Sequence, residues 1–261
     1  MHTVSLDDVL PGFDPRKGGD AHSPILSVVG ATKQFGGLVA IWNLSFDVQA
    51  GEVMGLMGPN GAGKTTLINL IAGVHKLDSG RISFNGNDIA GLPPHKICQL
   101  GIARTYQIPQ PFSSLTAVQN VMAAAMYARG LEKTAAEARA SKLLDIVDLS
   151  KKKDMLAKNL DVVTRKRLEL ARVLATNPNL LLIDEVAAGL TEREIPRVLD
   201  ILREIRKVGI TVILIEHVMR VMLEAVDRII VMDSGRKISE GTPNEVMKDK
   251  KVIETYLGEE A

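Results

Sequence analysis

Cysteine, aromatic side chains, net charge and long apolar runs are all scarce in this chain of 261 residues. Cys98 is the sole cysteine, so no disulfide can form within the chain, and a reducing compartment such as the cytosol is expected. Aromatic residues make up 3% of the chain and the net charge is +1, which leaves few platforms for base stacking and no broad basic surface. Nucleic acid is therefore not an expected partner. No stretch approaches the roughly 18 apolar residues that a membrane span needs.

The first 24 residues differ in composition from the rest. The stretch MHTVSLDDVLPGFDPRKGGDAHSP is rich in Gly, Asp and Pro, and it lacks the apolar core of a signal peptide. We therefore predict a disordered tail over residues 1–24 and one large domain over residues 25–261. Apolar residues make up 46% and charged residues 24%, so the domain can bury a sizeable core.

Strand and helix patterns alternate along the domain. ILSVVGATKQF and VAIWNLSFDVQ predict an antiparallel hairpin around Gly36-Gly37, and further strands are indicated by EVMGLM, GRISFNGNDI, NLLLID, ITVILIE and DRIIVMDSGRKISEG. Helical periodicity dominates from about residue 93 to residue 177, and short helices are indicated by PNEVMKD and KKVIETYLG. This alternation predicts an α/β fold with a mostly parallel sheet covered on both faces, with the helical block inserted as a subdomain.

The stretch GPNGAGKTT connects a predicted strand to an apolar helix and fits the pattern G-x-x-x-x-G-K-[ST]. Glycines let the backbone curl so that N–H groups point at a phosphate chain, and the start of the helix favours negative charge. Lys64 is expected to reach the β- and γ-phosphates, and the Thr65 hydroxyl to ligate Mg²⁺. We predict that this loop binds ATP through Gly58, Pro59, Asn60, Gly61, Ala62, Gly63, Lys64, Thr65 and Thr66.

Two adjacent carboxylates end the strand LLLIDE. The apolar residues 180–183 predict a buried strand that presents Asp184 to the metal. Glu185, one position further, can take a proton from an attacking water, and such general-base assistance is worth about 10²–10⁴ in rate. Two solvated acids after a core strand would look the same in isolation, but the upstream phosphate loop favours the catalytic interpretation.

Together these stretches resemble the ATP-binding cassette (ABC) ATPases. GPNGAGKTT, LLLIDE and the downstream ILIEH follow in the family's order, and the resemblance runs from about residue 25 to residue 261. Within that family the chain is most similar to the ATP-binding subunits of branched-chain (hydrophobic) amino-acid importers, through GIARTYQIPQPFSSLTAVQNV, RLELAR, DEVAAGL, IEHVMRVM and GRKISEGTPNEV. The resemblance implies a P-loop NTPase (RecA-like) fold with an antiparallel β subdomain and an inserted helical subdomain.

The resemblance also assigns roles to three single residues. Gln107 falls where the family places a Gln that contacts Mg²⁺ or the attacking water, so the implied metal ligands are Thr65, Gln107 and Asp184. His217 occupies the position of the family's switch histidine near the γ-phosphate. Phe35 stands where an aromatic ring lies under the adenine, and stacking of this kind is worth about 1–3 kcal/mol.

The signature loop departs from the family pattern. In relatives it reads Leu-Ser-Gly-Gly-Gln and contacts ATP held by the other subunit of a dimer, whereas here it is Leu160, Asp161, Val162, Val163 and Thr164. A carboxylate roughly 4 Å from a phosphate oxygen is repelled by about 4 kcal/mol at an effective dielectric constant near 20. Asp is also a favoured helix N-cap, and the two roles are compatible: the loop can start a helix and still be a poor partner for ATP.

Nearby, Val186 replaces the usual proline, and Thr191 replaces the Asp or Asn that ends the loop from Ala188 to Thr191 in relatives.

The resemblance implies a peripheral subunit on the cytoplasmic face of the cell membrane. Its expected partners are a second ABC ATPase subunit, as a homo- or heterodimer, transmembrane permease subunits and a separate solute-binding protein. The expected activity is ATP hydrolysis that drives import of branched-chain amino acids or related small solutes. Three alternatives stay open: a regulatory subunit that binds ATP with little turnover, a soluble ABC ATPase without a transport role, and a small-molecule kinase with a P-loop.

Overall fold

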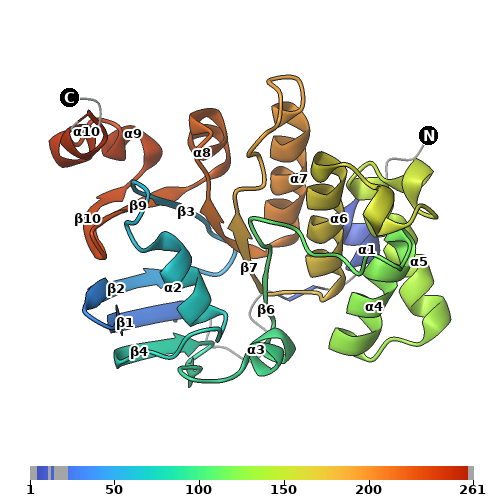
Figure 1. Ribbon diagram of the computed structural model, residues 1–261, viewed down its shortest axis with the longest axis horizontal. Helices are drawn as coiled ribbons and strands as arrows, with labels where there is room; N and C mark the ends of the chain where they lie inside the picture. Colours follow the sequence, from blue (N-terminus) through green and yellow to red (C-terminus); the bar gives the residue numbers. More distant parts are fainter. Residues whose placement is uncertain (1–4, 11–12, 15–22, 258–261) are drawn as a thin grey trace.

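The computed structural model describes residues 5–10, 13–14 and 23–257, and its centre is a six-stranded sheet (Figure 1). The strand order is β10-β9-β3-β8-β7-β6; the pairs from β9 to β6 are parallel, and β10 is antiparallel to β9. The strands are β3 (Val53–Met57), β6 (Ile102–Arg104), β7 (Leu180–Asp184), β8 (Thr211–Ile215), β9 (Arg228–Asp233) and β10 (Arg236–Gly241).

A second, antiparallel sheet has the order β2-β1-β4-β5. Its strands are β1 (Leu26–Phe35), β2 (Leu38–Val48), β4 (Ser79–Phe84) and β5 (Asn87–Asp88), and β1 and β2 form the predicted hairpin. Helix α2 (Lys64–Ile71) shares one apolar cluster with both sheets, so it joins them. The predicted α/β fold with an antiparallel β part is confirmed.

The central strands bury both of their faces, as their continuous apolar sequences require. Alternate residues of β7 and β8 belong to different apolar clusters. The cluster with α2 contains Leu180, Leu182, Ile213 and Ile215. The cluster with the helices of the other face contains Leu181, Ile183, Val212 and Leu214.

The helical block consists of α4 (Ala117–Arg129), α5 (Lys133–Ile146), the 3₁₀ turns η1 (Ser150–Lys152) and η2 (Ala157–Asn159), and α6 (Val162–Ala175). The prediction that this block starts near residue 93 is wrong at its beginning. Helix α3 (Pro94–Leu100) leads into β6, which pairs with β7 at the edge of the central sheet. Three residues are too short to show a strand period, and only the pairing with β7 reveals β6.

Four helices complete the described part of the chain: α7 (Ile195–Val208), α8 (Met219–Ala225), α9 (Pro243–Val246) and α10 (Lys250–Leu257). In Figure 1, α9 and α10 lie beside β10, whereas α7 stands next to α6. Helix α7 has apolar residues at helical spacing, all of them buried: Ile195, Val198, Leu199, Ile201, Leu202 and Ile205.

The predicted tail contains a short helix, α1 (Leu6–Val9), which corrects the expectation of disorder for residues 5–10. Leu6 is 0% exposed and joins the large cluster that contains α5 and α7 residues. Lys142 of α5 donates to the Asp8 carbonyl at 3.0 Å, and Lys207 of α7 lies 3.5 Å from the Asp7 carboxylate. Ser5 caps this helix in a capping box with Asp8, and the tertiary contacts then hold the short helix on α5 and α7. The rest of the predicted tail, residues 1–4, 11–12 and 15–22, lies outside the described residues.

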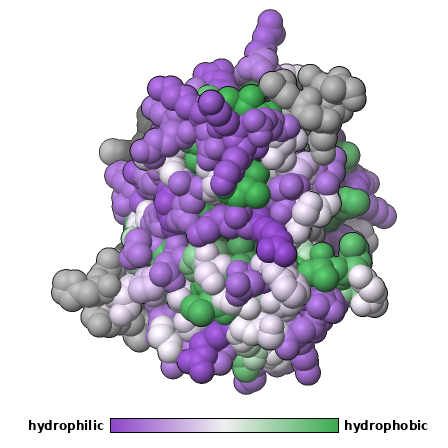
Figure 2. Space-filling view, turned by 90° about the vertical axis from the view of Figure 1, so that its left-hand side faces the viewer, coloured by the Kyte–Doolittle hydropathy of each residue, from purple (hydrophilic) through white to green (hydrophobic). Residues whose placement is uncertain are grey.

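One face of the molecule, which includes the antiparallel sheet and the C-terminal helices, is mostly hydrophilic with scattered apolar patches (Figure 2). Within the residues that the structure describes, no helix is long and apolar enough to cross a membrane.

Candidate functional site

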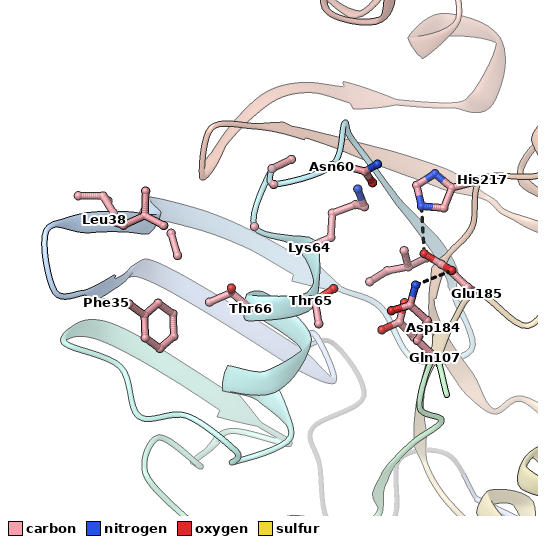
Figure 3. A pocket seen from close by; sticks show the side chains of 16 residues that line it. Phe35, Leu38, Asn60, Lys64, Thr65, Thr66, Gln107, Asp184, Glu185 and His217 are labelled. Atoms are coloured by element: carbon pink, nitrogen blue, oxygen red, sulfur yellow. Dashed lines mark hydrogen bonds and ion pairs between the residues drawn. The ribbon is translucent and has the colours of Figure 1, made fainter. Parts of the chain in front are cut away.

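Most of the predicted site residues gather at the carboxyl ends of four neighbouring strands. β3 leads into the glycine-rich loop, β7 ends at Asp184, β8 is followed by Glu216 and His217, and β6 leads towards Gln107. Parallel strands point their carboxyl ends to one edge of the sheet, so segments far apart in sequence meet there. Together they line one cavity of about 380 Å³ (Figure 3).

The glycine-rich loop needs glycine for steric reasons. Gly58 has φ 147°, and a Cβ there would lie 2.1 Å from the Met232 carbonyl oxygen. Gly63 has φ 100°, and its Cβ would lie 2.5 Å from the Ala40 carbonyl oxygen. The backbone can therefore follow this path only without side chains at these positions. Helix α2 begins immediately afterwards at Lys64, so its unsatisfied N–H groups open onto the cavity, as anion binding requires.

Lys64 is 8% exposed, and its ammonium group donates to the carbonyl oxygens of Gly58 at 2.5 Å and Pro59 at 2.9 Å. The amine is thus held inside the loop, at the wall of the cavity. Gly58 and Pro59 take part through these carbonyls and do not line the cavity. The other predicted loop residues do line it: Asn60, Gly61, Ala62, Gly63, Lys64, Thr65 and Thr66.

Asp184 and Glu185 have different environments despite being neighbours. Asp184 is 5% exposed, and burial together with the adjacent Glu185 charge raises the pKa of its carboxyl group. Its backbone N–H donates to the Thr105 hydroxyl at 3.0 Å, which fixes the end of β7 against the segment after β6. Glu185 has φ 52°, a left-handed conformation that residues with a side chain seldom adopt. This backbone turn sends the second carboxylate into the cavity.

Both oxygens of the Glu185 carboxylate are engaged. Gln107 donates from its amide to Oε2 at 2.9 Å, and the His217 Nε2 lies 3.2 Å from Oε1. Figure 3 shows this triad at one end of the cavity, beside Asp184. A carboxylate held from two sides has a fixed orientation, as a group that must face one water molecule needs.

Phe35 lies at the other end of the cavity, with Lys64 and Thr65 between it and Glu185 (Figure 3). Its ring is 42% exposed, and it contacts the His75 ring edge-on at a centroid distance of 5.1 Å. Along its length the cavity thus has an aromatic wall, then the phosphate loop, then an acidic end. This order matches the base, the phosphate chain and the terminal phosphate of a nucleotide. Sequence reasoning missed four further lining residues, which follow Phe35 in the hairpin or end β8: Leu38, Val39, Ala40 and Ile215.

The loop of residues 160–164 does not line this cavity. Asp161 is the N-cap of α6: its Oδ1 accepts the Thr164 N–H at 2.8 Å, and its Oδ2 accepts the Thr164 hydroxyl at 2.6 Å. Lys152 of η1 also donates to Oδ2 at 3.2 Å. These hydrogen bonds, led by the Thr164 hydroxyl, lower the pKa of Asp161 well below its usual range. Asp161 therefore acts as a helix cap in this chain, and the Lys152 ammonium group offsets part of the charge of the Asp161 carboxylate.

Comparison with known proteins agrees with this geometry. The sequence model described as ABC transporter matches residues 41–188, and the model described as branched-chain amino acid ATP-binding cassette transporter matches residues 236–261. The high-affinity branched-chain amino acid transport ATP-binding protein BraF of Pseudomonas aeruginosa is 37% identical over 251 residues, covering 90% of this chain and 98% of BraF. The chain belongs to the ABC transporter family.

Other relatives of this cassette give the same result. A probable branched-chain amino acid transport ATP-binding protein, LivG of Archaeoglobus fulgidus, is 35% identical over 245 residues and covers 90% of this chain and 95% of its own. A solved ATP-binding cassette of an ABC transporter in its ADP conformation has a TM-score of 0.80 at 32% identity, over 90% of this chain and 99% of that one. The chain is thus an ATP-binding, ATP-hydrolysing subunit of an ABC transporter, and subunits of this kind work with permease subunits.

Proposed function

We propose that this cassette hydrolyses ATP to drive a membrane importer for branched-chain amino acids or related small solutes. The names of its relatives and the match at residues 236–261 support the substrate class. The observation that carries the proposal is the single cavity in which the phosphate loop, Asp184 and the Glu185 triad meet.

In this proposal Glu185 is the general base. Its carboxylate accepts a proton from the water that attacks the γ-phosphate, while Gln107 and His217 hold its orientation through the contacts at 2.9 and 3.2 Å. Lys64 and the N-terminus of α2 bind the phosphates, and the ring of Phe35 stacks on the base. His217, which lines the same end of the cavity, is proposed to face the γ-phosphate.

Mg²⁺ fits the donor set at the acidic end. The hydroxyl of Thr65, the amide oxygen of Gln107 and the carboxylate of Asp184 line the same cavity, and oxygen ligands of this kind suit Mg²⁺ together with phosphate oxygens. No cluster of three His, Cys, Asp or Glu side chains able to hold a metal occurs among the described residues. A metal shared between protein and phosphates accords with that finding. Bound Mg²⁺ would neutralise charge that develops on the transferred phosphoryl group.

The complete assembly is proposed to contain a second cassette, permease subunits and a separate solute-binding protein, with this chain on the cytoplasmic face of the membrane. The loop of residues 160–164 supports a second cassette, because it lies outside its own nucleotide cavity. That position leaves it free to face the nucleotide of another chain.

The test is co-purification from mild detergent followed by reconstitution. The chain should carry permease subunits with it, and liposomes that hold this complex should take up labelled leucine or valine only with ATP and an intact Glu185. Absence of any permease in the preparation would count against the transport role. Uptake of other small solutes alone would change the substrate class.

A regulatory subunit that binds ATP with little turnover is a second candidate, favoured by Asp161 and the valines after it in the signature loop. ATP turnover by the assembled complex separates the two. A complex whose rate does not depend on Glu185 of this chain would support the regulatory role.

A further inference from the structure

The short loop after Asp184 holds Glu185 in an uncommon conformation. Glu185 has φ 52°, and the next residue is Val186, whose φ is not fixed by a ring as that of a proline would be. Within the loop, the Ala188 N–H donates to the Glu185 carbonyl at 3.4 Å, and so long a hydrogen bond does not fix the turn alone. Contacts from other elements must hold it.

Four backbone groups of this loop receive such contacts, and the first is the Glu185 N–H, which donates to the Ile215 carbonyl of β8 at 2.9 Å. The ammonium group of Lys166 donates to the carbonyl oxygens of Glu185 and Ala188, both at 2.8 Å. The Glu216 Oε1 accepts the N–H of Ala187 at 2.6 Å, from a carboxylate that is only 4% exposed. The loop is thus held by an ammonium group on two of its carbonyls and by a buried carboxyl oxygen on one of its amides. Hydrogen bonds to charged groups are stronger than neutral ones.

Lys166 reaches the loop from α6, whose start is fixed by the Asp161 cap. A lysine one turn into a capped helix has a defined anchor point, and its half-buried stem leads to the two carbonyls. The same helix therefore carries the signature loop at its N-terminus and the clamp on Glu185 within its first two turns.

We propose that Lys166 is a positioning residue for ATP hydrolysis: it holds the left-handed turn at Glu185 and so keeps the base aimed at the attacking water. Because Lys166 and residues 160–164 belong to the same helix or its start, a movement of the signature loop is transmitted through α6 to Glu185. A nucleotide of a second cassette that contacts the signature loop then acts on the base of this chain through one rigid element. The inference depends on the role of Glu185 proposed above.

The test compares Lys166→Met with Lys166→Arg in the co-purified complex. Lys166→Met keeps the apolar stem and loses the donors, so kcat for ATP should fall by about ten- to a hundredfold, as a misplacement of about 1 Å at a reacting group does. The affinity for ATP should stay unchanged, because Lys166 does not line the cavity. Lys166→Arg should restore most of the rate, since a guanidinium group can donate to both carbonyls.

Two controls isolate the effect. Lys151→Met removes one exposed lysine charge of the adjoining η1 turn and should leave kcat at the wild-type value. In a Glu185→Gln background, Lys166→Met should cause little further loss in single-turnover assays, since Lys166 acts through Glu185. If Lys166→Met does not fold, Lys166→Gln, which keeps an amide donor for one carbonyl, replaces it and should lose less rate.

The outcomes separate the two claims. Wild-type kcat in Lys166→Met, weaker ATP binding in that variant, or an equal loss in both backgrounds would overturn the positioning role. Undiminished turnover in Glu185→Gln alone would instead overturn the assignment of the base.

Discussion

At the scale of single residues, the cavity end around Glu185 makes the sharpest prediction. Glu185→Gln preserves size and the contact with Gln107 but removes the proton acceptor. We expect ATP binding to persist and steady-state turnover in the complex to fall by about 10²–10⁴, the usual contribution of a general base. Equilibrium nucleotide titration alongside an ATPase assay measures both. Full activity would exclude Glu185 as the base.

Phe35 makes a prediction about base selectivity. Its ring forms the wall of the cavity far from Glu185, so Phe35→Ala should weaken ATP and GTP binding alike, by about 1–3 kcal/mol, because stacking tolerates any base. Fluorescence titration with the two nucleotides provides the test. Trp42→Ala, at another exposed aromatic of the same hairpin, is the control and should bind both nucleotides normally. Unaltered affinity in the Phe35 variant would make the ring a packing residue.

The sequence indicated the phosphate loop and the two carboxylates because each motif imposes a local constraint. The glycines at 58 and 63 fit a phosphate loop, that loop gives the carboxylates after the apolar strand their catalytic interpretation, and one sheet edge brings the two motifs together. Lys166 carried no such signal. Its role depends on where a side chain from α6 meets the backbone of another loop, and that is set by tertiary packing.

At the scale of elements, the cap of α6 links stability to pH. Asp161→Ala removes the acceptor of the Thr164 N–H and should cost about 0.5–2 kcal/mol of unfolding free energy near neutral pH. The pKa of Asp161 is lower in the folded state, so its contribution is present above the ordinary carboxyl pKa. The contribution disappears as pH falls through the lowered value.

Denaturant unfolding of both proteins between pH 7 and pH 3 tests this, and the difference should shrink towards the acid end. Asp161→Ser keeps a capping oxygen and should resemble the wild type at neutral pH. A difference that grows on acidification would contradict the cap.

Helix α1 should be held chiefly by its apolar contacts. Leu6→Ala removes a fully buried side chain and should cost about 2–5 kcal/mol of the local stability that protects α1 from hydrogen exchange. Asp7→Asn breaks only an exposed ion pair with Lys207 and should change this protection little. Hydrogen exchange followed by mass spectrometry measures the protection of α1 and of the facing parts of α5 and α7 in one experiment. Equal effects of the two variants would refute apolar docking.

Elements differ in how far the sequence could predict them. The longer strands of the central sheet have apolar runs or alternation and were predicted, whereas β6 is too short to show either. Helix α1 has a local capping box, but it packs on residues more than 100 positions away. Helix α7 was not predicted, although its sequence pattern could have revealed it. Its buried residues follow clear helical spacing, so the sequence held enough information to place it.

At the scale of the whole molecule, the two nucleotide sites of a cassette dimer should be unequal. If the second cassette has an intact Ser-Gly-Gly loop, the site that contains Lys64 and Glu185 of this chain is complete. The opposite site meets Asp161 and the valines and lacks about 1.5–3 kcal/mol of hydrogen bonding, a factor of roughly 10 to 150. The Lys152 contact at 3.2 Å reduces the repulsion by Asp161 but does not restore the missing donors.

Substitution of Glu185 in this chain should therefore nearly stop ATP turnover by the complex. Substitution of the corresponding Glu in the second cassette should lower that turnover much less. Side-by-side ATPase assays of the two single variants decide it. Asp161→Ser with Val162→Gly and Val163→Gly should raise activity at the weak site. Equal losses in both Glu variants would favour a purely capping role for Asp161.

Helix α1 has a further consequence during synthesis. Helix α1 is made before both helices that it contacts, α5 and α7, and α7 ends at Val208, roughly 200 residues after Leu6. At about 5–20 residues per second, this interval is roughly 10 to 40 seconds. Throughout it, the apolar side chains of α1 have no completed surface to cover. Docking of α1 is therefore complete only when the α7 segment has been made and folded, so a stalled ribosome that holds a chain shortened before α7 would present α1 to chaperones with only its α5 contacts in place.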